Sequence, residues 1–119
     1  MITIYHNPNC SKSRHALELV KHFASLQCLP VEVVEYLKTP PTEQQLATLL
    51  RQLGCVVHDM VRSNEDEYNA LGLMQADDAH LLRAVAENPK LLQRPIVVYQ
   101  GRAVIGRPPE RLENLLKKD

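Results

Sequence analysis

A cysteine ten residues into the chain lies where its thiol could act as a nucleophile. Cys10 follows a strand expected at Ile2–Tyr5, where β-branched and aromatic residues dominate, and precedes a helix expected from about Ser13 to Leu26. The start of a helix carries N–H groups without intrahelical partners and the positive end of the helix dipole, and both stabilise a thiolate. We therefore predict that Cys10 has a lowered pKa and is reactive; an inert residue packed under a loop is the alternative interpretation.

The residues beside Cys10 indicate which thiol chemistry fits. Lys12 and Arg14 add positive charge, which favours attack on an electrophile or an oxyanion, and we expect them to tune the thiol and anchor the loop. Ser13 stands where a C-x-x-C motif would have its second cysteine, so dithiol chemistry within the chain is excluded. Ala16 stands where the loop of low-molecular-weight phosphatases requires arginine, so that chemistry is disfavoured.

The pattern of the chain indicates the elements that must position Cys10. Thr42, followed three residues later by Gln45, predicts a capping box at the start of a helix that ends at Gly54. Proline and glycine separate the other segments. The predicted elements are strands at Ile2–Tyr5, Val31–Tyr36, Arg94–Tyr99 and Arg102–Gly106, helices from about Ser13 to Leu26 and from Thr42 to Gly54, a mostly helical, polar stretch from Asp59 to Asn88 with a turn near Gly72, and a last helix opened by Arg107–Glu110.

The order of these elements predicts an α/β fold. A β-α-β unit requires a crossover and therefore parallel strands, whereas the later ββα part contains an antiparallel hairpin around Gln100 and Gly101. A cysteine at the first β-to-α junction of such a chain is typical of the thioredoxin-like fold. We expect one domain over residues 1–119, with a mixed sheet and an all-helical insertion at about 42–90 between the second and third strands.

Three arginines lie where a thioredoxin-like fold is expected to bring them toward Cys10. Arg62 lies in the helical insertion, Arg94 precedes the third strand, and Arg107 follows the hairpin. In that fold the proline before the third strand is usually cis and next to the thiol, which makes Pro95 the candidate. Each arginine alone is more typical of a solvated surface residue, but several guanidinium groups around one thiolate form a receptor for a tetrahedral oxyanion.

Three separated motifs resemble those of the glutaredoxin-linked arsenate reductases and their close relatives. The resemblance extends over nearly the whole chain, and the motifs are His6–Arg14, Arg94–Val98 and Gly106–Glu110.

The resemblance implies roles for single residues. It makes Cys10 the nucleophile and assigns the oxyanion to Arg62, Arg94 and Arg107. His6 matches the histidine of the first motif, where it either tunes the thiol or has a structural hydrogen-bonding role.

The resemblance also implies a reaction with external thiols. The Cys10 thiolate attacks arsenate and displaces hydroxide, while the arginines offset charge on the arsenate oxygens. Glutathione adds to the adduct, glutaredoxin resolves the mixed disulfide, and arsenite leaves. Glutathione is then a co-substrate, glutaredoxin is the expected partner, and no bound cofactor is expected. Another oxyanion or a glutathionylated protein is an alternative substrate.

Two other functions stay open at the level of the sequence. The same superfamily includes thiol-based regulators that bind RNA polymerase, and the lack of a C-x-x-C motif argues against a redox switch but not against docking. A glutathione-binding thiol transferase without arsenate activity would use Cys10 in a similar way. The set of arginines favours an oxyanion substrate over this last alternative.

The composition gives no support to several other classes of protein. The formal net charge is +0, from 14 basic and 14 acidic residues, which gives no indication of binding to nucleic acid or a membrane surface. No apolar run approaches the roughly 20 residues that a membrane-spanning helix needs, and no secretory signal is recognisable. The 3 cysteines are an odd number without a close pair, which favours the reducing cytoplasm over a disulfide framework. A monomer is the default expectation.

The other cysteines, histidines and acidic residues are given structural interpretations. Cys28 and Cys55 each stand next to an apolar residue and are expected to be buried. The histidines lack the spacing of metal ligands, so no metal site is expected. The run Glu65–Glu67 is interpreted as the solvated start of a helix.

Overall fold

The computed structural model describes residues 1–116, which form parts of two compact units. The first unit combines Met1–Tyr36 with the segment from Arg94 onward, and the second is Leu37–Gln93. The single domain expected over residues 1–119 stays a prediction, and its last three residues, Lys117–Asp119, lie outside the described range. Within that range, no helix has both the length and the apolar character needed to cross a membrane.

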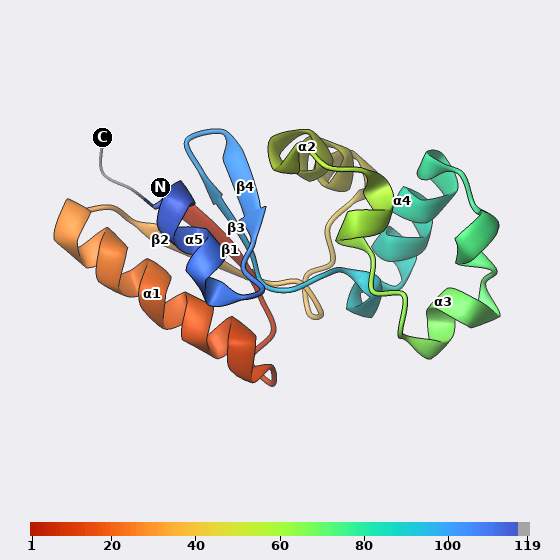
Figure 1. Cartoon of the computed structure of the whole chain (residues 1–119), viewed down its shortest axis with the longest axis horizontal. Helices are drawn as coiled ribbons and strands as arrows, with labels where there is room; N and C mark the ends of the chain where they lie inside the picture. The colour runs from red at the N-terminus through yellow and green to blue at the C-terminus, as the bar shows by residue number, and fades with distance from the viewer. Residues whose placement is uncertain (117–119) are drawn as a thin grey trace. The chain divides into compact units, whose positions relative to one another are not determined.

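The first unit is built on a four-stranded mixed sheet (Figure 1). The strand order is β2-β1-β3-β4; β1 is parallel to β2, and the β1–β3 and β3–β4 pairs are antiparallel. The predicted fold class is therefore confirmed: the sheet is the thioredoxin-like arrangement of a βαβ unit and a ββα unit. The strands are β1 (Ile2–His6), β2 (Val31–Glu35), β3 (Ile96–Tyr99) and β4 (Arg102–Ile105).

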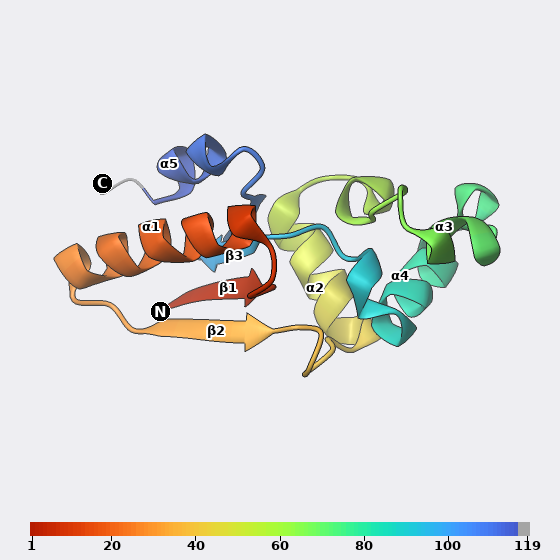
Figure 2. The same cartoon turned by 90° about the horizontal axis from the view of Figure 1, so that it is seen from below.

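Two helices pack on the same face of this sheet (Figure 2). They are α1 (Ser11–Gln27) and α5 (Leu112–Leu115), and α5 follows a 3-10 turn at Pro109–Arg111. The buried core lies between these helices and the two central strands, β1 and β3. Its buried residues are Ile2, Ile4, Ala16, Val20, Ala24, Val97, Leu112, Leu115 and Leu116.

The turns of the first unit explain where its elements end. α1 begins two residues before the expected start and ends at Cys28, which has φ of 55° and donates its N–H to the last turn. A left-handed residue is a common helix terminator, but it is usually glycine. The expected hairpin turn is confirmed at Gln100 and Gly101, with φ of 53° and 75°. These two turns set the lengths of α1 and of the β3–β4 hairpin.

The second unit is helical, as expected for the insertion. A capping box starts α2: the Gln45 N–H donates to Thr42 Oγ1 at 3.1 Å, and the Thr42 N–H donates to Gln45 Oε1 at 2.9 Å. The helix ends at Gly54, and the expected turn at Gly72 has φ of 64°. Helices α2 and α4 pack together. The helices are α2 (Glu43–Leu53), α3 (Asp66–Ala70) and α4 (Asp78–Glu87), with 3-10 turns at Val57–Met60, Leu73–Gln75 and Pro89–Leu91.

Two expectations about side-chain burial are wrong. Cys28 is exposed and Cys55 is only half-buried. Cys28 terminates α1, where the change of chain direction turns its side chain to solvent. The run Glu65–Glu67 does start a helix, as expected, with Glu65 at the N-cap of α3. Only Asp66 is exposed, because ion pairs hold the Glu65 and Glu67 carboxylates against the protein.

Candidate active site

Hydrogen bonds fix the loop that carries Cys10 at the start of α1. Asn7 accepts the N–H of Asn9 on its side-chain Oδ1 and the N–H of Cys10 on its carbonyl oxygen, both at 3.0 Å. The Arg14 guanidinium donates to the carbonyl oxygen of Pro8 at 2.9 Å. Cys10 consequently takes the N-cap position, with an extended backbone that aims the following amides along the helix axis.

A buried polar network joins this loop to the first turn of α1. His6 shares one face of β1 with Ile2 and Ile4, because side chains alternate along a strand, and that face packs on α1. The His6 Nδ1 atom lies 2.6 Å from the hydroxyl oxygen of Ser13, which is fully buried. The same oxygen accepts the N–H of Asn7 at 3.0 Å. The network therefore ties β1, the loop and α1 together beside Cys10.

Cys10 has a lowered pKa, as the sequence predicted. The largest influence is partial burial, which raises the pKa, but three donors together outweigh it. They are the N–H of Ser13, the guanidinium of Arg94 and the N–H of Lys12, and the positive charge of Arg94 acts in the same direction. The site thus stabilises a thiolate on a half-buried sulfur.

His6 is held toward its neutral form. Burial lowers its pKa, the negative charge of Glu35 opposes this shift, and the positive charges of Lys21 and Arg14 add to it. A neutral imidazole either donates to Ser13 or accepts from it, because the serine hydroxyl can rotate. The geometry supports a structural hydrogen-bonding role for His6, one of the two roles that the sequence left open.

Arg94 is the predicted arginine that the structure brings to Cys10. The Arg94–Pro95 peptide bond is cis, as expected, and Pro95 is buried. Gly106 donates its N–H to the Pro95 carbonyl at 2.8 Å, and a Cβ atom at Gly106 would lie only 3.2 Å from Pro95 Cγ. The Nε of Arg94 is buried and has no hydrogen-bond partner among the described residues. Arg94 therefore retains donor capacity near the sulfur.

Arg107 follows directly after the backbone pairing of Gly106 with Pro95. Its side chain is half-exposed, and within residues 1–116 it takes part in no hydrogen bond or ion pair. The neighbouring Arg107–Pro108 peptide bond is also cis. Arg107 thus lies at the same end of the β3–β4 hairpin as Arg94. The contact of Arg107 with an anion stays a prediction.

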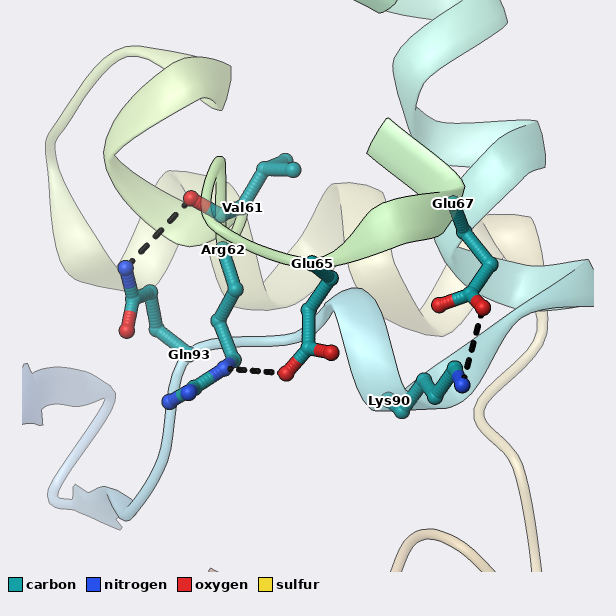
Figure 3. A network of polar contacts seen from close by, with 6 residues as sticks. All are labelled: Val61, Arg62, Glu65, Glu67, Lys90 and Gln93. Atoms are coloured by element: carbon teal, nitrogen blue, oxygen red, sulfur yellow. Dashed lines mark hydrogen bonds and ion pairs between the residues drawn. The ribbon is translucent and has the colours of Figure 1, made fainter. Parts of the chain in front are cut away.

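Arg62 lies in the second unit, so its predicted approach to Cys10 stays a prediction. Its N–H donates to the Leu91 carbonyl at 2.7 Å, and its Nε lies 3.1 Å from Glu65 Oε1 (Figure 3). Lys12, the remaining predicted residue, has an exposed side chain on the first turn of α1. Lys12 acts on the Cys10 thiol through its backbone N–H and not through its ammonium group.

Two residues of functional interest were missed from the sequence. Asn7 folds the loop through a side-chain bond to the residue two positions later, a pattern that asparagine before a helix commonly makes. Glu65 pairs with Arg62 over a spacing of three residues, which could have been noticed. Within the described residues, no group of three or more histidine, cysteine or acidic side chains is arranged to hold a metal ion.

Comparison with known proteins places this geometry in a family. The model of the ArsC family matches residues 5–115, a range that contains every predicted site residue from His6 to Arg107. The chain belongs to the ArsC family. An arsenate reductase of Neisseria meningitidis serogroup A is 44% identical over 118 residues, which is 97% of each chain.

Solved structures of ArsC-like proteins share the whole fold. A putative arsenate reductase from Yersinia pestis has a TM-score of 0.86 and 48% identity over 96% of this chain and 99% of its own. An arsenate reductase from Vibrio cholerae has a TM-score of 0.85 and 45% identity, over 94% and 95% of the two chains. The ArsC fold therefore extends over both units of the chain.

Proposed function

We propose that this protein reduces arsenate to arsenite, with Cys10 as the nucleophile. The observation that carries the proposal is the lowered pKa of Cys10 beside the Arg94 guanidinium, at the start of α1. A thiolate is the reactive form, and a neighbouring guanidinium attracts an oxyanion to it. The relatives named arsenate reductase, which match nearly the whole chain, support the same substrate.

The first half of the reaction builds an arsenic adduct on the protein. The Cys10 sulfur donates an electron pair to arsenic, an S–As bond forms, and one arsenate oxygen leaves as hydroxide, which takes a proton to become water. The thiol of glutathione replaces a second oxygen in the same way. Arsenic is still As(V) at this point.

The second half transfers two electrons. A glutaredoxin thiolate attacks the glutathione sulfur, and the bond between that sulfur and arsenic breaks. Its electron pair stays on arsenic, which becomes As(III), while glutathione and glutaredoxin form a mixed disulfide. Water then releases arsenite and restores the Cys10 thiol. Both external thiols are needed because Ser13 stands where a second protein cysteine would be.

The arginines are proposed to bind the arsenate oxygens. Arg94 has unused donor capacity at Nε, and Arg107 has a side chain without an ion-pair partner among the described residues. Arg62 is proposed as the third ligand. Each guanidinium offers two parallel donors and a permanent charge, and together they stabilise the charge that develops on the oxygens.

The supporting residues act through the protein rather than on arsenate. Ser13, with His6, holds the loop, and its N–H and that of Lys12 stabilise the thiolate. Arg14 fixes the loop at Pro8. The proposed reaction needs no bound cofactor, and its thiol partners are abundant in the cytoplasm, where we propose that a monomeric protein works.

A coupled assay tests the proposal. We would measure arsenate-dependent NADPH consumption with glutathione, glutaredoxin and glutathione reductase, and we expect Cys10→Ser to abolish turnover because the nucleophile is lost. Cys28→Ser is the matched control, since it removes an exposed thiol outside the site, and it should retain full activity. Full turnover by Cys10→Ser, or none by the natural chain while glutaredoxin is shown to be competent, would contradict the proposal.

A further inference from the structure

The second unit holds one arginine in a defined orientation. The Arg62 side chain is only 12% exposed, and its Nε lies 3.1 Å from Glu65 Oε1. Figure 3 shows the two terminal nitrogens on the side of the guanidinium that faces away from Glu65. Within the described residues, no other side-chain hydrogen bond or ion pair engages this guanidinium. One edge of Arg62 is therefore occupied and the other is available.

The backbone on both sides of this contact is also fixed. The Arg62 N–H donates to the Leu91 carbonyl at 2.7 Å, and the Glu65 N–H donates to the Arg62 carbonyl at 3.4 Å. Glu65 stands at the N-cap of α3 and accepts the N–H of Tyr68 on its carbonyl at 3.1 Å. The Glu65 side chain therefore extends from a turn that backbone hydrogen bonds hold in place. This limits the positions in which its carboxylate can hold the Arg62 guanidinium.

Glu65 is the acidic residue of its run that acts on Arg62. Glu67 points to a different partner, with its Oε1 2.9 Å from Lys90 Nζ (Figure 3), and Asp66 is exposed. The Glu67 carboxylate is thus paired with Lys90 and not with Arg62. Glu67 offers a neighbouring carboxylate that can be neutralised as a control.

We propose that Glu65 is a positioning residue, which holds Arg62 by Nε so that its two terminal amino groups form a free fork for an oxyanion. The inference rests on the proposed function, in which Arg62 binds arsenate. A long arginine side chain loses rotational freedom when it binds a ligand, and this loss weakens binding. Glu65 restricts Arg62 before the anion arrives, so less freedom is lost on binding.

The carboxylate also has an opposing effect. Its negative charge repels an anion, so a glutamate is useful here only if its hold on the geometry outweighs that repulsion. Glutamine separates the two effects, because its carbonyl oxygen can still accept the Arg62 Nε–H while the charge is absent. Alanine removes both the acceptor and the charge. The pair of variants therefore tests positioning directly.

Arsenate binding to the full-length Cys10→Ser chain, measured by calorimetry, provides the test without any reaction. We expect Glu65→Ala to weaken binding about threefold to tenfold, the range typical of freeing one long side chain. Glu65→Gln should bind arsenate as tightly as the parent or more tightly. Arg62→Ala should weaken binding at least as much as Glu65→Ala, and Glu67→Gln should leave it unchanged.

Two further readouts separate positioning from a general loss of structure. With Cys10 present, Glu65→Ala should raise KM for arsenate and leave kcat unchanged, and Glu65→Gln should restore KM. In the absence of arsenate, the Arg62 Nε–H signal in nitrogen-15 NMR should be protected from exchange in the natural chain and in Glu65→Gln, but not in Glu65→Ala.

The outcomes distinguish this inference from the function on which it rests. Unweakened binding by Glu65→Ala, or equal weakening by Glu65→Ala and Glu65→Gln, would overturn the positioning role while arsenate binding stands. Binding that is unaffected by Arg62→Ala would also overturn it. If the parent chain neither binds nor turns over arsenate, the proposed function itself fails, and the inference fails with it.

Discussion

At the scale of single residues, Ser13 connects the structure of the loop to the reactivity of the thiol. Its N–H lowers the pKa of Cys10, and its buried hydroxyl binds His6 and accepts the N–H of Asn7. One residue of the first helical turn thus stabilises the thiolate and attaches the loop to β1. Serine instead of a second cysteine at this position therefore matters for the structure of the loop as well as for the chemistry of the thiol.

Removing the Arg94 guanidinium should raise the pKa of Cys10. Arg94→Ala deletes both the hydrogen bond and the positive charge that favour the thiolate. In this variant we expect iodoacetamide to alkylate the Cys10 thiol severalfold more slowly at neutral pH. The pH profile of the alkylation rate should be displaced to higher pH.

The measurement requires a background without other accessible thiols. Cys28→Ser combined with Cys55→Ser provides it, since Cys28 is exposed and Cys55 is half-buried. Arg102→Ala on β4 is the matched control, because Arg102 is exposed and does not act on the thiol. An unchanged pH profile in Arg94→Ala would show that Arg94 does not stabilise the thiolate.

The residues that could be predicted are those whose roles depend on local sequence. Cys10 at a strand–helix junction and Pro95 before a strand were recognisable because the neighbouring residues define their positions. The link between His6 and Ser13 was not, because it depends on how β1 packs against α1. The burial of Cys28 was predicted wrongly because its apolar neighbours did not reveal that it terminates the helix in a left-handed conformation.

At the scale of elements, the helix signals in the sequence correspond to real caps. Thr42 and Gln45 form the predicted capping box, and Gly54 terminates the same helix. The boundaries of α1 were less accurate, because its first turn is set by the hydrogen bonds of the preceding loop rather than by apolar periodicity. Helices with side-chain caps can thus be located from sequence more closely than one that begins at a reactive cysteine.

The capping box should contribute measurably to stability. Thr42→Ala removes the acceptor for the Gln45 N–H, and we expect the free energy of unfolding to fall by about 1 kcal/mol. Urea denaturation measures this loss. Thr39→Ala in the preceding loop is the control and should change stability by less than about 0.5 kcal/mol; equal losses in the two variants would show that the box contributes nothing specific.

At the scale of the whole molecule, the predicted site residues are divided between the two units. The thiol, its stabilising amides and Arg94 belong to the first unit, and Arg62 belongs to the second. The sequence predicted the topology of the sheet because element order and crossover rules restrict it. It could not predict how Arg62 is held, because Glu65 was interpreted as part of a solvated helix start.

The stability of the folded chain should decline in mild acid because of His6. Burial lowers its folded pKa below the ordinary value of 6.5, so the unfolded chain binds a proton more readily. Between 6.5 and the lower folded pKa the unfolded state holds more protons, and stability is therefore lost as the pH falls through this window.

Urea denaturation at about pH 7.5 and about pH 5.5 tests this linkage. The natural chain should lose more stability between the two conditions than a His6→Gln variant, which has no proton to gain at this position. The same loss of stability in both chains would mean that other groups cause it.

The exposed position of Cys28 has a consequence for handling the purified protein. Cys10 and Cys28 flank the 17 residues of α1, so their thiols are separated by about 25 Å and cannot form an intramolecular disulfide. Air oxidation of a stored sample will instead link two molecules through Cys28. Such covalent dimers should be visible on non-reducing gels and should lower the measured number of free thiols. Fresh reductant, or Cys28→Ser, keeps such material out of crystallisation and kinetic samples.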